Sequence, residues 1–201
     1  DPIRLELPEL EENIKGQTVL VTGAAGSIGS ELARQIAINA PRKLILYDQA
    51  ETPLYYLELE LLDLAPDLEI VPIVASVTDQ DAVTQVFETH RPQKVYHAAA
   101  YKHVPLMEQN PRSAALTNIL GTYLVGLAAA RTGAQAFVLV STDKAVRPSN
   151  VMGATKQAAE RAVLHLQEQY PDTSFGAVRF GNVLGSSGSV IPLFERQLER
   201  E

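Results

Sequence analysis

Three glycines at intervals of three residues, Gly23, Gly26 and Gly29, form the pattern in this chain that points most directly to chemistry. They follow an apolar run at residues 18–22 and open an amphipathic run at residues 27–39. The first glycine permits a tight turn, the second lets backbone amides approach a phosphate, and the third allows a helix to pack closely on a strand. The helix start adds unpaired amides and a positive dipole end. The pattern predicts a dinucleotide site with cofactor contacts from Gly23, Ala25, Gly26, Ser27, Ile28 and Gly29.

An acidic residue at the right distance from this turn indicates which dinucleotide is bound. Asp48 ends the apolar run 43–47 and lies 19 positions after Gly29. A carboxylate there can accept hydrogen bonds from both hydroxyls of an adenosine ribose, and it would repel a 2′-phosphate. The sequence therefore predicts NAD rather than NADP. The simpler alternatives are a structural glycine turn and a solvated loop aspartate.

A second polar group, Ser141-Thr142-Asp143-Lys144, ends the apolar run 136–141. An Asp beside a Lys supplies a potential acid and base within one turn, although an exposed ion pair at a strand end would look the same. Lys156 lies in the next amphipathic run, with Met152 one turn earlier on the same face. A thioether exchanges no proton, so Met152 cannot be an acid or a base.

Runs typical of strands alternate with runs typical of helices along the chain. We predict strands at 18–22, 43–47, 69–74, 94–97, 136–141 and 174–179, and helices at 27–39, 52–64, 79–88, 111–131 and 150–169. Repeated strand–helix units predict an α/β fold with a doubly wound parallel sheet of the Rossmann type, which binds ligands outside the carboxyl ends of its strands. We assign residues 1–16 to an N-terminal arm and residues 17–201 to an NAD-binding catalytic core.

The composition excludes several kinds of partner. The 201 residues are 46% hydrophobic and 20% charged, as in an ordinary globular domain. A net charge of −7 without a cluster of Lys or Arg argues against nucleic acid and anionic membrane surfaces. The chain has no Cys, and its four His lack metal-ligand spacing, so we expect no metal. The longest apolar run, residues 119–130, is too short to span a bilayer.

Five segments together resemble one protein family closely. They are VTGAAGSIGSEL at 21–32, AAAYKHVP at 98–105, STDKA at 141–145, GATK at 153–156 and RFGNVLG at 179–185. They resemble the bacterial polysaccharide-biosynthesis nucleotide-sugar 4,6-dehydratases, extended short-chain dehydrogenase/reductases that act on UDP-N-acetylglucosamine. The superfamily has Tyr where this chain has Met152, but the large, membrane-anchored branch of the family also has Met there. Met152 is therefore a mark of that branch more than of a dead enzyme.

The resemblance implies a dehydration with an internal redox cycle. The sugar is oxidised at C4, loses water across C5 and C6, and is reduced at C6. On this sequence Lys144 would be the base at C5, where many relatives have Glu, and Asp143 would be the acid that protonates the leaving C6 hydroxyl. Thr142 would hydrogen-bond the C4 oxygen, and Lys156 would hold the nicotinamide ribose. Asp143 or a water held by Lys156 would accept the C4 proton.

Other roles implied by the resemblance fall on binding residues. Further cofactor contacts are expected from Ser76, Val77, Ala98, Ala99 and Ala100, and substrate contacts from Lys102, His103 and Asn182. Many relatives have Gly-Asp in place of Ala75-Ser76, and that Asp holds the adenine amine, which Ser76 would do more weakly. We expect Asn118 to support the fold and His97 to pack in the core.

The resemblance also implies a wider setting. Family members continue well past the equivalent of Glu201, so we expect the C-terminal substrate-binding part to be largely absent and the isolated chain to have little or no turnover alone. The chain would be soluble, with a membrane-anchored parent at the cytoplasmic face of the bacterial inner membrane. It would form a homo-oligomer and act in surface polysaccharide or capsule synthesis. The alternatives are a nucleotide-sugar epimerase, which Met152 disfavours, and a non-catalytic NAD-binding module, which Asp143 and Lys144 disfavour.

Overall fold

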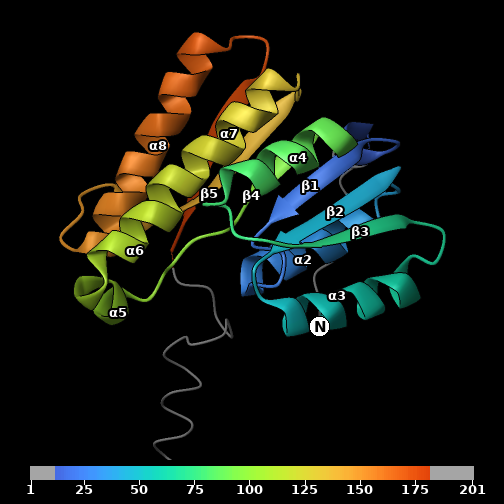
Figure 1. Ribbon diagram of the computed structural model, residues 1–201, viewed down its shortest axis with the longest axis horizontal. Coiled ribbons are helices and arrows are strands. Elements are labelled where there is room, and N and C mark those ends of the chain that lie inside the picture. The colour runs from blue at the N-terminus through green and yellow to red at the C-terminus, as the bar shows by residue number, and fades with distance from the viewer. Residues whose placement is uncertain (1–11, 182–201) are drawn as a thin grey trace, which may run out of the picture.

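The computed structural model describes residues 12–181, which are built around a sheet of six parallel strands (Figure 1). The strands are β1 (Thr18–Thr22), β2 (Lys43–Asp48), β3 (Glu69–Val74), β4 (Lys94–His97), β5 (Ala136–Thr142) and β6 (Ser174–Phe180). Their order across the sheet is β3-β2-β1-β4-β5-β6. The winding direction reverses between β1 and β4, and at such a switch point the carboxyl ends of the strands leave a crevice for a ligand.

Helices cover both faces of this sheet (Figure 1). They are α2 (Ser27–Ala37), α3 (Glu51–Leu64), α4 (Gln80–His90), α5 (Val104–Gln109), α6 (Pro111–Ala115), a π-helical segment (Leu116–Gly121), α7 (Thr122–Arg131) and α8 (Val151–Gln169), with a 3-10 turn at Asp143–Ala145. The side chains of α2 and α3 share one core with one face of the sheet, and those of α4, α7 and α8 share a second core with the other. The predicted doubly wound α/β fold is confirmed.

The central strands are buried on both sides, which explains their continuous apolar runs. All five residues of β1 are buried, and it pairs with β2 on one side and β4 on the other. Val19 and Val21 face the core under α2 and α3, whereas Leu20 faces the opposite core. Each of the six predicted strands is present and ends within one residue of its predicted bound.

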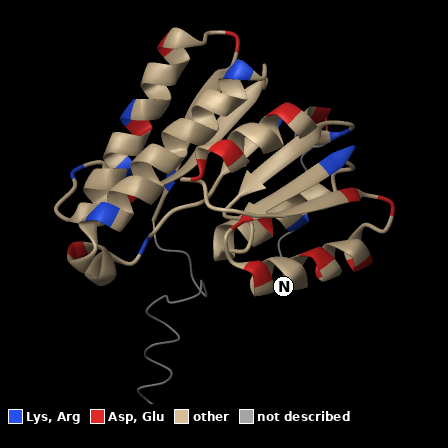
Figure 2. Cartoon of the chain, viewed as in Figure 1, with Lys and Arg blue, Asp and Glu red and all other residues tan. Residues whose placement is uncertain are grey.

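Helices α2 and α3 turn apolar side chains toward the sheet and carry charged side chains on their exposed faces. Figure 2 shows acidic residues recurring along α3. Arg34 of α2 forms a two-point pair with Glu60 of α3, at 2.7 Å from Nε to Oε1 and 2.9 Å from Nη2 to Oε2. Ile14, in the described end of the N-terminal arm, is 1% exposed and joins the core beneath these helices. The arm thus contributes a side chain to the folded core.

Two helical stretches differ from the prediction. Residues Val104–Gln109 form α5, which the sequence analysis did not include because six residues show too little periodicity. The predicted helix at 111–131 contains a π-helical turn at Leu116–Gly121. A π turn holds an extra residue and marks a local constraint. Here Asn118 turns its amide toward the Tyr101 backbone, and at Gly121 a Cβ would lie only 2.6 Å from Val77 Cγ2.

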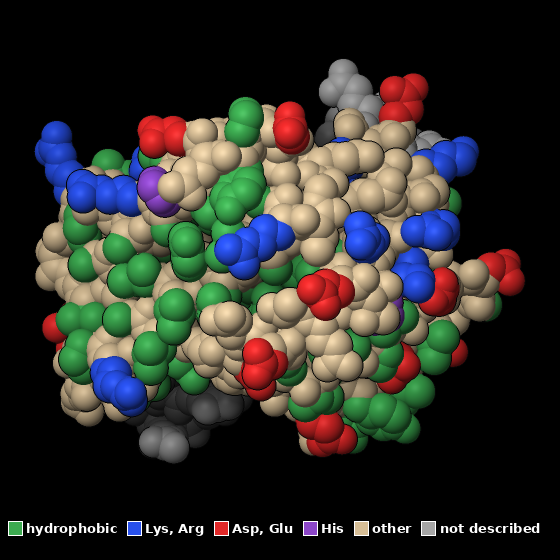
Figure 3. All heavy atoms as spheres, turned by 45° about the horizontal axis from the view of Figure 1, so that its top comes forward, with side chains coloured by type: hydrophobic (Ala, Val, Ile, Leu, Met, Phe, Trp, Pro, Cys, Tyr) green, Lys and Arg blue, Asp and Glu red, His purple; other side chains and the backbone are tan. Residues whose placement is uncertain are grey.

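The same helical run is more apolar than our count of twelve residues suggested. Among the described residues, Pro111–Arg131 is the one helix long and apolar enough to cross a membrane, judged by length and composition only. In the structure its α7 part packs against α4, α8, β4 and β5. Figure 3 shows hydrophobic side chains gathered over α7 and α8, and Leu120 and Leu164 are among the exposed large ones. The apolar composition therefore serves a core face and leaves an exposed apolar face as well.

The predicted core histidine lies at the end of β4. His97 is fully buried, with Thr22 Oγ1 2.7 Å from Nδ1 and Thr122 Oγ1 3.0 Å from Nε2. Thr122 donates its own hydroxyl hydrogen to the Asn118 carbonyl, so Nε2 must carry the ring proton and Nδ1 must accept from Thr22. Burial, together with the nearby charge of Lys156, lowers the pKa of His97 to about 3. The neutral ring thus ties β1 to the start of α7.

This histidine makes stability depend on pH. Between pH 6.5 and pH 3 the unfolded chain binds a proton at His97 that the folded chain does not bind, so unfolding becomes easier as the pH falls. Between pH 7 and pH 5 the loss from this group is about 2 kcal/mol. His97→Gln removes it, so urea denaturation should show the difference in unfolding free energy between wild type and variant shrinking by that amount. His165→Gln, at an exposed position of α8, is the control. A difference that stays constant with pH would contradict the neutral assignment.

Candidate cofactor and active site

The glycine-rich turn brings three backbone segments into close contact. Gly23 has a φ of +66°, and its amide donates to the Tyr47 carbonyl at 2.9 Å. A Cβ on Gly23 would lie 2.5 Å from the Ala99 nitrogen, and a Cβ on Gly29 would lie 2.0 Å from the Gly23 carbonyl oxygen. Helix α2 starts after Gly26 without a capping side chain. The turn therefore presents a helix start against the ends of β1 and β4, which is the geometry that binds a phosphate.

Asp48 is fixed beside this turn. Its Oδ2 accepts a hydrogen bond from the Ala25 amide at 3.0 Å, and its Oδ1 accepts one from the Ala50 amide at 2.9 Å. The residue is half-buried at the end of β2. A carboxylate oxygen has capacity for more than one hydrogen bond, so Asp48 can hold the turn and a ribose hydroxyl together.

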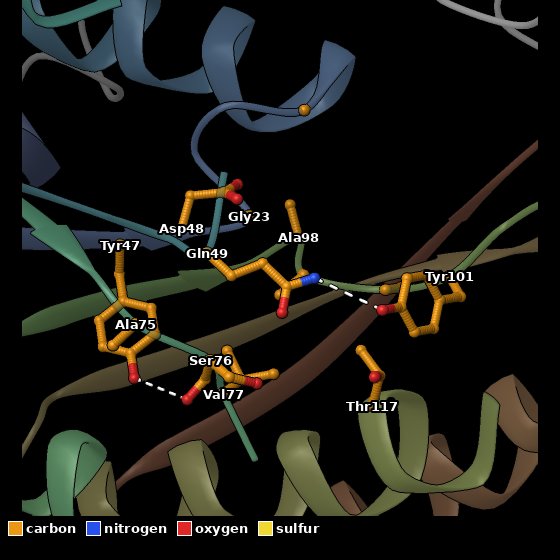
Figure 4. Close-up of a pocket in the computed structure, with 13 residues that line it drawn as sticks. Gly23, Tyr47, Asp48, Gln49, Ala75, Ser76, Val77, Ala98, Tyr101 and Thr117 are labelled. Carbon is orange, nitrogen blue, oxygen red and sulfur yellow. Dashed lines mark hydrogen bonds between the residues drawn. The ribbon is translucent and has the colours of Figure 1, made fainter. Parts of the chain in front are cut away.

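A cavity of about 130 Å³ opens between the turn and the ends of β1, β2, β3 and β4 (Figure 4). It is lined by Gly23, Gly26, Tyr47, Asp48, Gln49, Ala75, Ser76, Val77, Ala98, Ala99, Ala100, Tyr101 and Thr117. The structure thus brings together eight residues that the sequence analysis assigned to the cofactor. The cavity lining also includes Tyr47, Gln49, Ala75, Tyr101 and Thr117. The first four are next to a predicted residue in the sequence, whereas Thr117 reaches the cavity through tertiary packing.

At the β3 side of the cavity, a buried tyrosine supports Ser76. The Tyr47 hydroxyl donates to the Ser76 carbonyl at 2.8 Å, and burial raises the pKa of Tyr47 to about 12. The Ser76 hydroxyl lies 2.9 Å from Thr78 Oγ1 and accepts from the Thr78 amide at 3.2 Å. Ser76 therefore already has local partners, which agrees with a weaker hold on an adenine than a carboxylate would give.

At the opposite side of the cavity, Tyr101 is held through its backbone. Asn118, fully buried, accepts from the Tyr101 amide at 2.8 Å and donates to the Tyr101 carbonyl at 3.1 Å. It also donates to Thr155 Oγ1 at 3.0 Å, which links this loop to α8. Figure 4 shows Tyr101 across the cavity from Asp48, with its hydroxyl near Gln49. The supporting role predicted for Asn118 agrees with these bonds.

The candidate catalytic residues lie after β5 and do not line the cavity. The Thr142 hydroxyl donates to Asp143 Oδ1 at 2.9 Å and accepts from the Lys144 amide at 3.4 Å. Lys144 Nζ lies 3.2 Å from the same Asp143 oxygen, with side chains 37% and 59% exposed. The hydrogen bond from Thr142, and then that from Lys144, hold the pKa of Asp143 below its usual range. Without a ligand, therefore, the pair is an exposed ion pair.

Lys156 and Met152 share the buried face of α8, as their spacing predicts. Lys156 is 4% exposed, and its Nζ donates to the Val140 carbonyl at 2.8 Å. Burial lowers the pKa of Lys156 to about 8. Met152 is also 4% exposed and packs with Met107 and Ala114 rather than in a polar setting. The position at which the superfamily has Tyr is thus occupied here by an apolar side chain in an apolar cluster.

The remaining predicted residues fall into three places. Ala25, Ser27, Ile28 and Gly29 belong to the glycine turn and the first turn of α2, outside the cavity lining. Lys102 and His103 are exposed in the loop that follows β4, with His103 at the start of α5. Asn182 lies outside the described residues. The residues predicted to bind the cofactor therefore lie mainly at the ends of β1 to β4, and those predicted to carry the reaction lie at the end of β5 and in α8. We call these two parts of the sheet edge the cofactor half and the reactive half.

The fold defines a Rossmann-type domain of the short-chain dehydrogenase/reductase kind, with a cavity at the switch point of its sheet. The chain belongs to a family described as polysaccharide biosynthesis proteins, whose model matches residues 19–201. Its relatives include both nucleotide-sugar dehydratases and nucleotide-sugar epimerases.

Curated relatives extend beyond this chain in length. Capsular polysaccharide biosynthesis protein CapD of Staphylococcus aureus is 49% identical over 99% of the chain and 33% of that protein. UDP-N-acetylglucosamine 4,6-dehydratase (inverting) of Campylobacter jejuni is 34% identical over 90% of the chain and 53% of that enzyme. The chain therefore spans between a third and about half the length of these relatives.

Solved structures share the fold. Pen from Bacillus thuringiensis superposes with a TM-score of 0.86 at 36% identity, covering 92% of this chain and 57% of that one. WbmH of Bordetella bronchiseptica, solved in complex with NAD+, superposes with a TM-score of 0.72 at 24% identity, covering 92% of this chain and 64% of that one. The second likeness concerns the fold alone.

The glycine turn generates a direct test. Gly29→Ala places a Cβ on the Gly23 carbonyl, where neither backbone can yield cheaply, so the free energy of unfolding should fall by about 3 kcal/mol. Dinucleotide binding, measured by calorimetry, should be lost with it. The matched control is Gly176→Ala on β6, where a Cβ meets nothing within 4 Å and the change should stay within about 0.5 kcal/mol. Equal stability of the two variants would disprove the close contact.

Proposed function

We propose that the protein binds NAD and, as part of the whole protein, dehydrates a UDP-N-acetylhexosamine, UDP-N-acetylglucosamine above all, to its 4-keto-6-deoxy sugar. The observation that carries this proposal is the crevice itself. The glycine turn and Asp48 line it at the ends of β1–β4. Asp143, Lys144 and the buried Lys156 lie outside its lining, after β5 and in α8, and the end of β5 is at the same edge of the sheet. The similarity to a UDP-N-acetylglucosamine 4,6-dehydratase supports the substrate.

The cofactor half suits an NAD molecule in extended form. The amides at the start of α2 would bind the pyrophosphate, and Asp48 would accept from the ribose hydroxyls. Ser76 and Val77 would border the adenine, whereas Ala98 to Ala100 leave the floor free of large side chains. When bound, NAD would supply the hydride chemistry, oxidation at sugar C4 and reduction at C6.

The reactive half supplies the proton transfers. Lys144 takes the C5 proton on its Nζ, for which it must first lose its own proton. Asp143 gives a proton to the C6 hydroxyl, which leaves as water. In the structure Asp143 is held ionised by Thr142 and Lys144, so it must first take up a proton, which the C4 hydroxyl or the Lys144 ammonium can supply once the sugar is bound. Thr142, once released, can donate to the C4 oxygen.

Lys156 would orient the nicotinamide ribose from its buried position at Val140. Since Met152 offers no exchangeable proton, the proton of the C4 hydroxyl must go to Asp143 or to a water held by Lys156. The apolar packing of Met152 counts against a C4 epimerase that uses a phenol at this position. The sugar product, followed by NMR, separates the possibilities: a 4-keto-6-deoxy sugar supports the dehydratase, a C4 epimer an epimerase, and unchanged sugar a non-catalytic NAD-binding module.

Three wider features belong to the same proposal. The whole protein would act in surface polysaccharide or capsule synthesis, in line with its family and with CapD. It would be anchored at the cytoplasmic face of the bacterial inner membrane. Copies of the chain would associate through the exposed apolar face of the helical run Pro111–Arg131 and of α8, where Leu120 and Leu164 are exposed.

Cofactor selectivity tests the role of Asp48. The chain should bind NAD more tightly than NADP, because the carboxylate accepts from the ribose hydroxyls and repels a 2′-phosphate. Asp48→Ala should narrow the difference, since a lost hydrogen bond costs on the order of 1 kcal/mol. Calorimetry with both cofactors measures it, with Asp63→Ala, on the exposed side of α3, as the control. Equal or tighter binding of NADP by the wild type would overturn the assignment.

Solvent exchange at sugar C5 tests the role of Lys144. Lys144→Ala in the whole protein should still oxidise C4, seen as absorbance of reduced cofactor, but should form no 4-keto-6-deoxy sugar. Loss of a positioned base costs about 10²–10⁴ in rate. In deuterated water the wild type should incorporate deuterium at C5 and the variant should not. Lys94→Ala, at the opposite end of β4, is the control. Exchange at the wild-type rate in Lys144→Ala would assign the base elsewhere.

A further inference from the structure

Glu160 is a buried carboxylate for which the proposed reaction gives no role. It is 6% exposed and lies one helical turn after Lys156, on the face of α8 that packs against β5 and β6. Its Oε1 accepts from Ser141 Oγ at 2.5 Å and from Arg179 Nε at 2.9 Å, and its Oε2 accepts from Arg179 Nη2 at 2.6 Å. A buried carboxylate is costly unless it is paired and hydrogen-bonded, and a two-point guanidinium pair meets that need.

Lys156 and Glu160 bind neighbouring residues of β5. The ammonium of Lys156 donates to the Val140 carbonyl, and the carboxylate of Glu160 accepts from Ser141. The next three residues of the chain are Thr142, Asp143 and Lys144. Helix α8 is therefore hydrogen-bonded to β5 immediately before the candidate catalytic residues, through the Lys156 ammonium and the Glu160 carboxylate on adjacent helical turns.

We propose that Glu160, kept ionised by Arg179, is a positioning residue that maintains Lys156 as an ammonium and fixes it at the carboxyl end of β5. Glu160 is buried and both of its oxygens are bonded to Ser141 or Arg179, so it acts through Lys156 rather than on a ligand. The inference rests on the proposed function in that Lys156 is to hold a ribose. The contacts themselves are independent of that role.

The charges around Lys156 explain why such a residue is needed. Burial lowers the pKa of Lys156 to about 8, and the charge of Glu160 acts in the opposite direction. From β4 the facing titratable group is His97, whose pKa of about 3 leaves it neutral. From β6 it is Arg179, whose charge is already paired with Glu160. Glu108 of α5 contacts α8 at its first turn, through the Val151 amide.

The proposed reaction requires opposite states of two lysines. Lys144 must lose its proton to act as the C5 base, whereas Lys156 binds a ribose hydroxyl best as an ammonium, because a charged donor makes the stronger hydrogen bond. Lys144 is 37% exposed beside Asp143, so its surroundings can change when a sugar binds. Lys156 is 4% exposed, and its counter-charge is built into the fold. Glu160 thus allows Lys156 to stay protonated under conditions in which Lys144 loses its proton.

The test is a titration of Lys156 in the 201-residue chain, followed by NMR of ¹³Cε-labelled lysine. The signal is identified by its loss in Lys156→Arg. Glu160→Gln keeps the size and the bond to Ser141 but removes the charge, so the Lys156 midpoint should fall from near pH 8 by about one pH unit, a tenfold change in the ratio of charged to neutral lysine. Glu160→Asp keeps the charge and should restore much of the shift.

Ser141→Ala is the matched control, since it removes a hydrogen bond to Glu160 and leaves the charge in place. Its midpoint should match that of the wild type. NAD affinity, measured by calorimetry at a series of pH values, should weaken above the Lys156 midpoint in the wild type. In Glu160→Gln this weakening should begin about one pH unit lower. A chain that binds no NAD would refute the proposed cofactor, and the NMR midpoint would still decide the role of Glu160. An unchanged midpoint in Glu160→Gln overturns the inference.

Discussion

Backbone packed directly on backbone at the glycine turn sets the geometry on which the rest of the crevice depends. A side chain at Gly29 would overlap the Gly23 carbonyl, and one at Gly23 would overlap the end of β4 at Ala99. Because both positions lack a Cβ, helix α2 can start immediately above β1 and expose its first amides at the sheet edge. Asp48 then reaches the Ala25 amide, and the turn and the carboxylate become one rigid unit.

A buried polar network connects this unit to the second half of the site. Thr22, at the end of β1, bonds His97, which bonds Thr122, and Thr122 bonds the Asn118 carbonyl. The Asn118 side chain then reaches Tyr101 and Thr155. Each of these hydrogen bonds joins a donor to an acceptor, which is the condition for a polar network to be tolerated inside a core. The π-helical turn lets one helix serve both the core and this network.

The two halves of the crevice use charge differently. In the cofactor half a carboxylate accepts from backbone amides and the local charge is negative, which suits hydroxyl donors. In the reactive half Lys144 lies in the turn after β5, and Lys156 lies in the helix that follows, α8. The side chain of Lys144 is 37% exposed, whereas Lys156 is 4% exposed. Burial favours a neutral lysine, and only a fixed counter-charge opposes it. The Glu160 carboxylate is the negative charge that acts in this direction, and Arg179 keeps that carboxylate ionised.

Much of the fold could be predicted from the sequence because its patterns are local. Strand bounds agree within one residue, since continuous apolar runs between polar breaks have few other solutions. The glycine turn and Asp48 were equally predictable, because each depends on backbone geometry or on a fixed distance along a βα unit. The helix α5 and the π-helical turn were not, because a short helix has little periodicity and a π turn arises from contacts with distant residues.

The site shows the same division. Residue types and spacing were enough to name Asp48, Asp143, Lys144 and Lys156, because a chemical group can be read from a single residue. Their surroundings could not be read in this way. The pairing of Glu160 with Arg179 joins α8 to β6, and Asn118 meets Tyr101 across 17 positions of chain. Burial, protonation and hydrogen-bond partners depend on which distant segments pack together, and only the tertiary structure decides that.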